Sequence, residues 1–409
     1  MKDIQRRSPA YQVMLVLLLS LNFGILFFDR NAANFLMPYV QPDLQLSNTQ
    51  VGLLASGLSL TWAVAAFLVG SYADRTGRRK SLLIASGLLF SVCSVLSGLA
   101  GTFAALLGAR LLMGLAEGGN MPISHAIVAG EVTPTRRGLA NGVTQNLGSN
   151  LLGSTVAPLV LVPLAIHFGW RHAFFLAAAP GLIATALVWL LVKPPLVAPV
   201  GRPKGAGTLR EVLRDRNVVI CALMSVLLVG YLVICWGFMP LFLTKVRGFD
   251  GQTMAWLMAT LGIAATVGSF LTPAISDAIG RRKVMIPAPF IGVILPLGAM
   301  YWHGPVFVLA GLFFVGWTLN GIFPMFMATV PSESVDPRLV VTAMGLSMGL
   351  GEALGGVFGP LGAGWIADRT SLAAPLWCMV VLCVTAGILA LGLRETAPRV
   401  LGKARAEAG

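Results

Sequence analysis

The feature that most constrains this chain is a succession of apolar runs, each about 20 residues long, which fill most of its 409 residues. A helix of that length crosses the hydrocarbon core of a bilayer, which is about 30 Å thick. Backbone amides and carbonyls in lipid have no water to bind, so a spanning segment must satisfy them internally. We therefore expect an all-α membrane protein.

Twelve runs have the required length, and charged or turn-forming clusters separate them. They cover approximately residues 11–38, 49–72, 81–100, 102–129, 138–162, 173–192, 218–243, 253–276, 284–302, 305–330, 339–365 and 374–393. The polar stretch 193–217 between the sixth and seventh runs holds four prolines and six basic residues and cannot span. We predict two six-helix bundles, 1–192 and 218–393, with a cytoplasmic linker at 193–217 and a cytoplasmic tail at 394–409.

Composition excludes a water-soluble protein, because 56% of the residues are hydrophobic, 11% are charged and the mean hydropathy is +0.82. The net charge of +13 does not indicate nucleic-acid binding, since the basic residues cluster at the ends of apolar runs. With the N-terminus inside, 23 of the 29 Lys and Arg fall in cytoplasmic segments and four fall outside. This asymmetry predicts an inner (cell) membrane protein with both termini in the cytoplasm.

Signals for catalysis, cofactors or ATP use are absent from the sequence. The five Cys lie within apolar runs without a C-x-x-C pair, and the four His are scattered. Neither H-E-x-x-H nor a Walker loop occurs. We expect no enzyme activity, no metal and no cofactor, and an ion gradient as the energy source.

An internal repeat relates the two halves of the chain. The pattern D-x-x-G-R-R-K occurs at Asp74–Lys80 and again at Asp277–Lys283, an offset of 203 residues. Other landmarks keep nearly this offset, namely Gly142 with Gly345, Gly148 with Gly351, and Pro122 with Pro324. Parallel six-helix repeats of this kind are typical of alternating-access transporters and argue against a channel.

The stretch Gly70-Ser-Tyr-Ala-Asp74-Arg75-x-Gly77-Arg78-Arg79-Lys80 resembles the signature turn of the major facilitator superfamily. The layout of twelve spans in two pseudo-symmetric bundles resembles that family over the whole chain. The resemblance implies a monomer in which Asp74 and Arg78 help to hold the outward-facing state. The repeat extends this gating role to Asp277 and Arg281.

Five ionisable residues fall well within the apolar runs, namely Asp29, Arg30, Arg110, Glu117 and Glu352. Each costs roughly 2.5–3.5 kcal/mol on insertion scales, so such groups usually face a cavity and have a function. Arg110 and Glu117 are two turns apart on one helix face, about 10 Å from each other. Asp29 and Arg30 point about 100° apart and should find different partners. The crossed pairs Asp29–Arg110 and Glu117–Arg30 are the ones to expect, unless the set is only a network that ties helices together.

The chemistry of these groups suits an anion and protons. Arg30 offers a planar fork to a carboxylate, and buried Asp29 and Glu117 can take up protons. Phe28-Asp29-Arg30, together with Arg110-x6-Glu117-Gly118 and the following Pro122 and His125, resembles the anion:cation symporter branch of the superfamily. That branch includes sugar-acid permeases, sialic-acid exporters and vesicular glutamate carriers.

This second resemblance implies a role for each residue of the set. Arg30 would contact the substrate carboxylate, Asp29 and Glu117 would carry protons, Arg110 would couple to them, and His125 would modulate coupling. The seventh span lacks the second Arg of some relatives in this branch, which disfavours dicarboxylates. Glu352 corresponds to Ser149 by the repeat, and it fits either a different proton stoichiometry, a cationic group on the substrate, or helix packing.

Further polar and aromatic residues are candidates to line the cavity, namely Asn34, Gln145, Ser149, Tyr231, Trp236 and Asn320. We predict a secondary active transporter that takes up a small organic anion, such as a sugar acid or other monocarboxylate, together with protons. The alternative is a proton-coupled efflux antiporter for drugs or lysolipids. Uptake is favoured because Gly148–Pro158 does not keep the G-x-x-x-G-P-x-x-G-G spacing of such antiporters.

Overall fold

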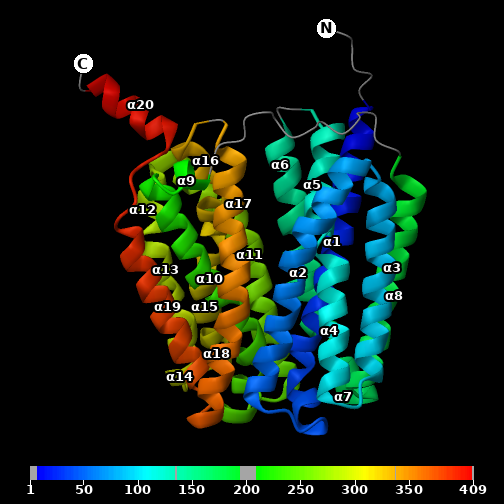
Figure 1. Cartoon of the computed structure of the whole chain (residues 1–409). Coiled ribbons are helices and arrows are strands. Elements are labelled where there is room, and N and C mark those ends of the chain that lie inside the picture. The colour runs from blue at the N-terminus through cyan, green and yellow to red at the C-terminus, as the bar shows by residue number, and fades with distance from the viewer. Residues whose placement is uncertain (1–6, 134–135, 194–208, 337, 408–409) are drawn as a thin grey trace. The chain divides into compact units, whose positions relative to one another are not determined.

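The computed structural model describes residues 7–133, 136–193, 209–336 and 338–407, apart from the side chains of Asp74 and of residues 403–407. Within these ranges the chain is helical and forms no strand, which confirms the all-α prediction. It divides into two compact units (Figure 1). Unit 1 holds residues 1–46, 57–201 and 251–262, and unit 2 holds residues 47–56, 202–250 and 263–409.

Two helices, α2 (Asn48–Thr76) and α11 (Gly251–Ile279), begin in one unit and continue in the other. The other elements of unit 1 are α1 (Pro9–Asp43), α3 (Arg79–Leu99), α4 (Phe103–Glu117), α5 (Asn120–Glu131), α6 (Arg137–Gly142), η2 (Val143–Leu147), η3 (Ser149–Val156), α7 (Ala157–Phe168) and α8 (Trp170–Leu191). Those of unit 2 are α9 (Leu209–Val212), α10 (Arg216–Leu241), η4 (Phe242–Val246), α12 (Arg281–Met285), α13 (Pro287–Gly292), α14 (Ile294–Tyr301), α15 (Val306–Trp317), η5 (Thr318–Ile322), η6 (Met325–Thr329), α16 (Val330–Ser334), α17 (Val340–Leu350), η7 (Gly351–Gly355), α18 (Gly356–Arg369), α19 (Ala374–Ala390) and α20 (Pro398–Glu407). Residues 194–208 of the predicted linker lie outside the described residues.

The membrane spans agree with the predicted runs in number and order. Ten helices of the described chain are long and apolar enough to cross a membrane, and α19 is a shorter apolar helix of 17 residues. The span expected at 102–129 is built from α4 and α5, which meet at Gly118 and Gly119. A Cβ atom at Gly118 would collide with the carbonyl oxygen of Trp62, so glycine lets α4 approach α2 closely here.

The sequence repeat reappears as a shared irregularity of the backbone. The π-helical segments η3 and η7 overlap when one is shifted by the repeat offset of 203 residues. Gly148 and Gly351 stand at corresponding positions, and a Cβ atom at either would collide with the first long helix of its unit, at Ser20 or Ser225. Each glycine thus permits the same close helix contact in its own unit.

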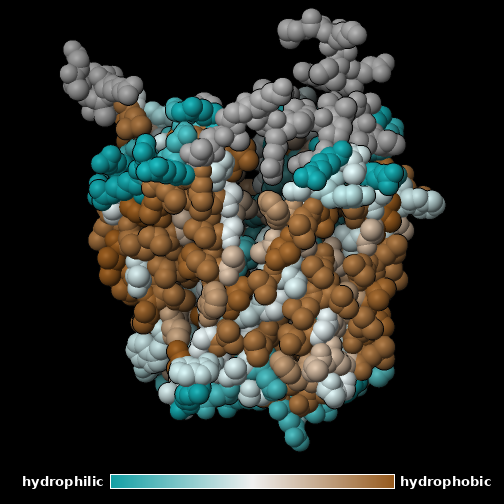
Figure 2. Space-filling model, viewed as in Figure 1, coloured by the Kyte–Doolittle hydropathy of each residue, from teal (hydrophilic) through white to brown (hydrophobic). Residues whose placement is uncertain are grey.

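Apolar side chains cover the outer faces of the helices. Figure 2 shows hydrophobic residues across the middle of the visible face of each unit and hydrophilic residues at both ends. Phe67, Trp189, Phe307 and Phe358 are each more than half exposed and would face solvent if no lipid covered them. The chain is a multi-pass membrane protein.

The first turn of α2 is capped twice. Ser47 and Gln50 form a capping box, in which each backbone N–H donates to the side chain of the other, at 2.9 and 3.1 Å. Asp368 of α18, in the same unit, accepts from the backbone N–H groups of Asn48 and Thr49 at 2.8 and 2.7 Å. A carboxylate at a helix N-terminus satisfies free N–H groups and interacts favourably with the helix dipole.

We expect Asp368→Ala to destabilise this end of unit 2 by about 1 kcal/mol, the usual effect of losing a helix cap. The measurement is the midpoint of thermal unfolding in detergent, followed by tryptophan fluorescence. Asp336→Ala is the matched control, since the one ion-pair partner of this exposed carboxylate among the described residues is Arg338, at 3.9 Å. Equal midpoints for the two variants would contradict a capping role for Asp368.

Candidate functional site

Three charged side chains are fully buried in the interior of unit 1. Asp29 on α1, and Arg110 and Glu117 on α4, have exposed fractions of 0%, 1% and 0%. The predicted spacing of Arg110 and Glu117 is realised, because α4 is an unbroken helix between them. Charged groups at this depth are stable only with partners or with a function that retains them.

Asp29 is held by a serine of α3. The Ser94 hydroxyl donates to Oδ1 of Asp29 at 2.5 Å and lies 3.0 Å from the carbonyl oxygen of Phe174 on α8. The other carboxylate oxygen, Oδ2, has no hydrogen-bond partner among the described residues. Asp29 therefore keeps one oxygen available for a proton.

Arg110 is also held by α3, one turn further along. Its Nη2 donates to the Ser97 hydroxyl at 2.7 Å, and its guanidinium lies 5.3 Å from the centre of the Phe174 ring. In the described part of the chain, Nε and Nη1 find no hydrogen-bond acceptor. The cation is thus stabilised by an aromatic face and one hydroxyl.

Glu117 accepts no hydrogen bond at either carboxylate oxygen from the residues that the structure describes. Its charged neighbours are Arg30, Asp29 and Arg110. Arg30 is half-buried and lies between two aromatic rings, 5.4 Å from Phe27 and 5.5 Å from Trp62 of α2. The guanidinium of Arg30 keeps its donors free of side-chain hydrogen bonds to Glu117.

The crossed pairs expected from the sequence are electrostatic neighbours, Asp29 with Arg110 and Glu117 with Arg30. Within the described residues neither approaches to the 4.0 Å of an ion pair. The four groups therefore form an open set, whose members interact through space without being locked in pairs. Such a set can change partners when a proton or an anion arrives.

The remaining candidates in unit 1 bind mostly to their own helices. Asn34 donates to Asn31 at 3.3 Å, and Ser149 donates to the carbonyl oxygen of Gln145 at 2.5 Å. Gln145 itself is half-buried in η2. His125 is partly buried on α5, and its Nε2 has no hydrogen-bond partner in the described structure.

Two of the candidates in unit 2, Tyr231 and Trp236, meet at a tryptophan. Tyr231 stacks on Trp317 with ring centres 5.9 Å apart, and Trp236 packs edge-on against the same ring at 5.3 Å. The Tyr231 hydroxyl donates to the carbonyl oxygen of Gly292 at 2.9 Å. Asn320 lies in the 3₁₀ segment η5, and Glu352 is half-buried in the π-helical segment η7. A single cavity that gathers residues of both units remains a prediction.

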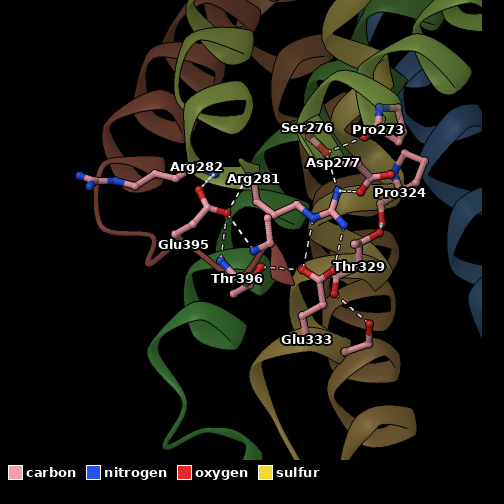
Figure 3. Close-up of polar contacts among 12 residues, drawn as sticks. Pro273, Ser276, Asp277, Arg281, Arg282, Pro324, Thr329, Glu333, Glu395 and Thr396 are labelled. Carbon is pink, nitrogen blue, oxygen red and sulfur yellow. Dashed lines mark hydrogen bonds and ion pairs between the residues drawn. The ribbon is translucent and has the colours of Figure 1, made fainter. Parts of the chain in front are cut away.

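The second copy of the D-x-x-G-R-R-K motif forms a dense charge cluster (Figure 3). Arg281, with its side chain 8% exposed, binds both carboxylate oxygens of Glu333 at 2.9 and 3.2 Å and contacts Asp277 at 2.5 Å. Glu395 accepts from the backbone N–H of Arg281 at 2.7 Å, and Thr396 donates to Glu333 at 2.7 Å. The guanidinium thereby joins the end of α11 to α16, and the segment after α19 binds to the Arg281 backbone and to Glu333.

The first copy of the motif is described only in part. Arg78 is exposed at the start of α3, and the side chain of Asp74 lies outside the described residues. Glu131, which corresponds to Glu333 at an offset of 202 residues, forms an ion pair with Arg7 at 3.3 Å, whereas Glu333 binds Arg281.

We expect Arg281→Ala to destabilise unit 2 by about 2 kcal/mol or more, because it leaves the partly buried Glu333 without its cation. Arg281→Lys should recover only part of the lost stability, since its ammonium group lacks the planar fork with which a guanidinium binds both carboxylate oxygens. Chemical denaturation in detergent measures the change. Arg282→Ala is the matched control, with an exposed side chain and one weak contact to the Leu391 carbonyl at 3.4 Å. If Arg282→Ala were equally damaging, the cluster around Arg281 would have no special role.

Several residues of the site were missed by sequence reasoning. They are the hydroxyls and rings that touch the charged groups, namely Phe27, Trp62, Ser94, Ser97 and Phe174, and the ring of Trp317, which packs against Tyr231 and Trp236. The serines had a detectable signal, because Ser91, Ser94 and Ser97 recur every three residues within an apolar run. This spacing places them on one helix face.

Comparisons with known proteins agree with this architecture. A hexuronate transporter of Bacillus subtilis is 28% identical, over 87% of this chain and 88% of its own length. The multidrug resistance protein MdtL of Escherichia fergusonii is 26% identical, over 86% of this chain and 84% of its own. The crystal structure of a bacterial homologue of the human lysosomal transporter Spinster, in an inward-facing and unoccupied conformation, superposes with a TM-score of 0.80 at 19% identity. It covers 94% of this chain and 98% of that one.

The fold of twelve spans, the two related units and these likenesses point to one family of transporters and not to an enzyme. The sequence matches that family over residues 19–351 and again over residues 233–409, which together reach from the first span to the last residue. The chain belongs to the Major Facilitator Superfamily.

Proposed function

We propose that this transporter takes up a small organic anion together with protons across a bacterial inner membrane. The observation that carries the proposal is the open charge set of unit 1, in which two buried carboxylates and two arginines lie near one another and form no ion pair with any described residue. A merely structural network would satisfy its charges by pairing them. Unpaired atoms on buried ions suit a site that exchanges protons and binds charge.

The chemistry assigns a separate task to each carboxylate and each arginine. A proton on Glu117 removes the negative charge that faces Arg30 and leaves the guanidinium free for a substrate carboxylate. A proton on Asp29 has the same effect on Arg110. Loading of protons thus favours loading of an anion, and release of one favours release of the other, which is the condition for symport.

The substrate class follows from the number of arginines in the set that a substrate can reach. Arg30 is the half-exposed arginine of the set, whereas Arg110 is 1% exposed. One accessible guanidinium matches one carboxylate, and the hydroxyls of a sugar acid could bind polar side chains such as Asn34 and Gln145. The hexuronate transporter among the relatives is consistent with this class.

The test is transport by purified protein in liposomes that contain a pH-sensitive dye. We expect a panel of sugar acids and monocarboxylates to acidify the lumen when added outside, with protein-free liposomes as the baseline. An anion that enters without any proton movement would leave the transport of anions standing and remove the proton coupling.

Efflux of drugs by antiport is the second candidate, and the likeness to MdtL favours it. The same carboxylates would then bind a cation in exchange for protons. The same liposomes distinguish the two candidates. Release of protons from the lumen when lipophilic cations are added outside, with no response to any anion, would establish antiport and overturn the anion proposal.

A further inference from the structure

We propose that Ser94 and Ser97 of α3 are positioning residues that keep Asp29 and Arg110 from closing into an ion pair. The inference rests on the proposed proton-coupled function and adds to it the element that keeps the charge set open. Both serines are fully buried and lie three residues apart, on one face of α3. One holds the carboxylate and the other holds the guanidinium.

The hydroxyl of Ser97 has a fixed orientation. It donates its single proton to the carbonyl oxygen of Cys93 at 2.7 Å, so a lone pair is left to accept from Nη2 of Arg110 at 2.7 Å. Arg110 is thereby anchored to α3 and stacked on Phe174. Of the two carboxylates with unsatisfied oxygens in the described structure, Asp29 has the larger electrostatic effect on the guanidinium, so we expect Asp29 to become its partner once this acceptor is lost.

The hydroxyl of Ser94 has two acceptors within reach and one proton to give. While Asp29 is ionised, the hydroxyl donates to its carboxylate at 2.5 Å. When Oδ1 of Asp29 carries a proton, the carboxyl group can donate to Ser94, and Ser94 can turn its own proton to the carbonyl oxygen of Phe174 at 3.0 Å. Ser94 can therefore keep its hydrogen bond to Oδ1 of Asp29 in both protonation states of the carboxyl group.

Asp29 and Arg110 must stay apart for the site to work. A closed Asp29–Arg110 pair would cancel both charges, and a proton would then have to break a buried ion pair to reach Asp29. With the serines in place, Asp29 and Arg110 each bind α3 through one atom, and their other polar atoms have no hydrogen-bond partner in the described structure. Ser94 and Ser97 thus preserve the sensitivity of the site to protons.

A spectroscopic test reads the hydrogen bonds directly and does not depend on transport. Infrared difference spectra of the purified protein between acid and alkaline pH would be assigned with Asp29→Asn. We expect Ser94→Ala to raise the stretching frequency of the protonated Asp29 carboxyl, because its hydrogen-bond partner is gone. Ser97→Ala should alter the ionised carboxylate band of Asp29, because Arg110 becomes its partner.

A transport test uses the same variants in liposomes, with Ser91→Ala as the matched control. Ser91 is buried on the same helix, but its hydroxyl donates to the carbonyl oxygen of Gly87 on its own helix, at 2.9 Å. We expect Ser97→Ala to reduce proton-driven accumulation about tenfold, the effect of losing one hydrogen bond to a charged group, while substrate exchange at equal pH persists. Ser94→Thr keeps the hydroxyl and should retain coupling.

Infrared bands of Asp29 that are identical in wild type, Ser94→Ala and Ser97→Ala would overturn the positioning role. An equal loss of transport in Ser91→Ala would overturn it as well, since any buried serine of α3 would then matter. If the wild-type protein moved no protons with any anion, the proposed function would fall. Shifted Asp29 bands would in that case still establish the positioning role.

Discussion

Replacing Arg30 with alanine is expected to abolish uptake of the carboxylate substrate. The half-buried guanidinium lies 5.4 Å from the ring of Phe27 and 5.5 Å from that of Trp62, and it forms no side-chain hydrogen bond within the described part of the chain. Losing a charged hydrogen-bonding partner costs about 3 kcal/mol, so uptake at low substrate concentration should fall about 100-fold or more. Initial rates of uptake of a labelled sugar acid into liposomes, at a fixed pH gradient, measure the loss.

Two further variants separate the charge of Arg30 from its shape and from general damage. Arg30→Lys keeps the charge but not the planar fork, so an intermediate rate with a raised KM is expected. Arg171→Ala is the matched control, because this arginine forms an exposed ion pair with Asp43 at 2.6 Å. The uptake rate of Arg171→Ala should stay within about twofold of the wild-type rate, because exposed ion pairs contribute little to stability. Normal uptake by Arg30→Ala would remove Arg30 from the substrate site.

Much of the fold could be predicted because lipid imposes a simple rule on the sequence. Each span must be apolar over about 20 residues, so hydropathy locates helices such as α3 and α8 directly. The repeated D-x-x-G-R-R-K turn added the relation between the halves. The break between α4 and α5 and the π-helical segment η3 could not be predicted, because close contacts between particular helices produce them.

The charged members of the site could also be predicted, because ionisable groups in apolar runs are rare and conspicuous. Their hydroxyl partners could not be singled out. Serines in spanning helices often bind their own backbone, as Ser91 does, and sequence alone does not distinguish it from Ser94. The difference arises only from the neighbouring helices, which place Asp29 opposite one serine and Gly181 opposite the other.

A Glu117→Gln variant is expected to lose proton-driven accumulation of the substrate and keep exchange of substrate for substrate. Glutamine has nearly the shape of glutamate but cannot take up or release a proton, so it imitates the protonated state permanently. The side chain has room for this change, since neither carboxylate oxygen accepts a hydrogen bond within the described structure. Because the variant cannot release a proton at this position, the carrier loaded with substrate can change between its outward-facing and inward-facing states in both directions. The proton gradient can no longer drive the return of the empty carrier.

Two measurements on the same liposomes show whether this separation occurs. Accumulation under a pH gradient should fall to the level of equilibration, and counterflow into substrate-loaded liposomes should remain within about threefold of wild type, a difference below 1 kcal/mol. The pH dependence of exchange should also flatten, since the group that responds to protons is gone. Glu211→Gln controls for the loss of a carboxylate elsewhere, because Glu211 is a partly exposed carboxylate of unit 2 that contacts Arg338 at 3.5 Å. If counterflow disappeared together with accumulation, Glu117 would be needed for substrate binding or folding, and the proton role would pass to Asp29.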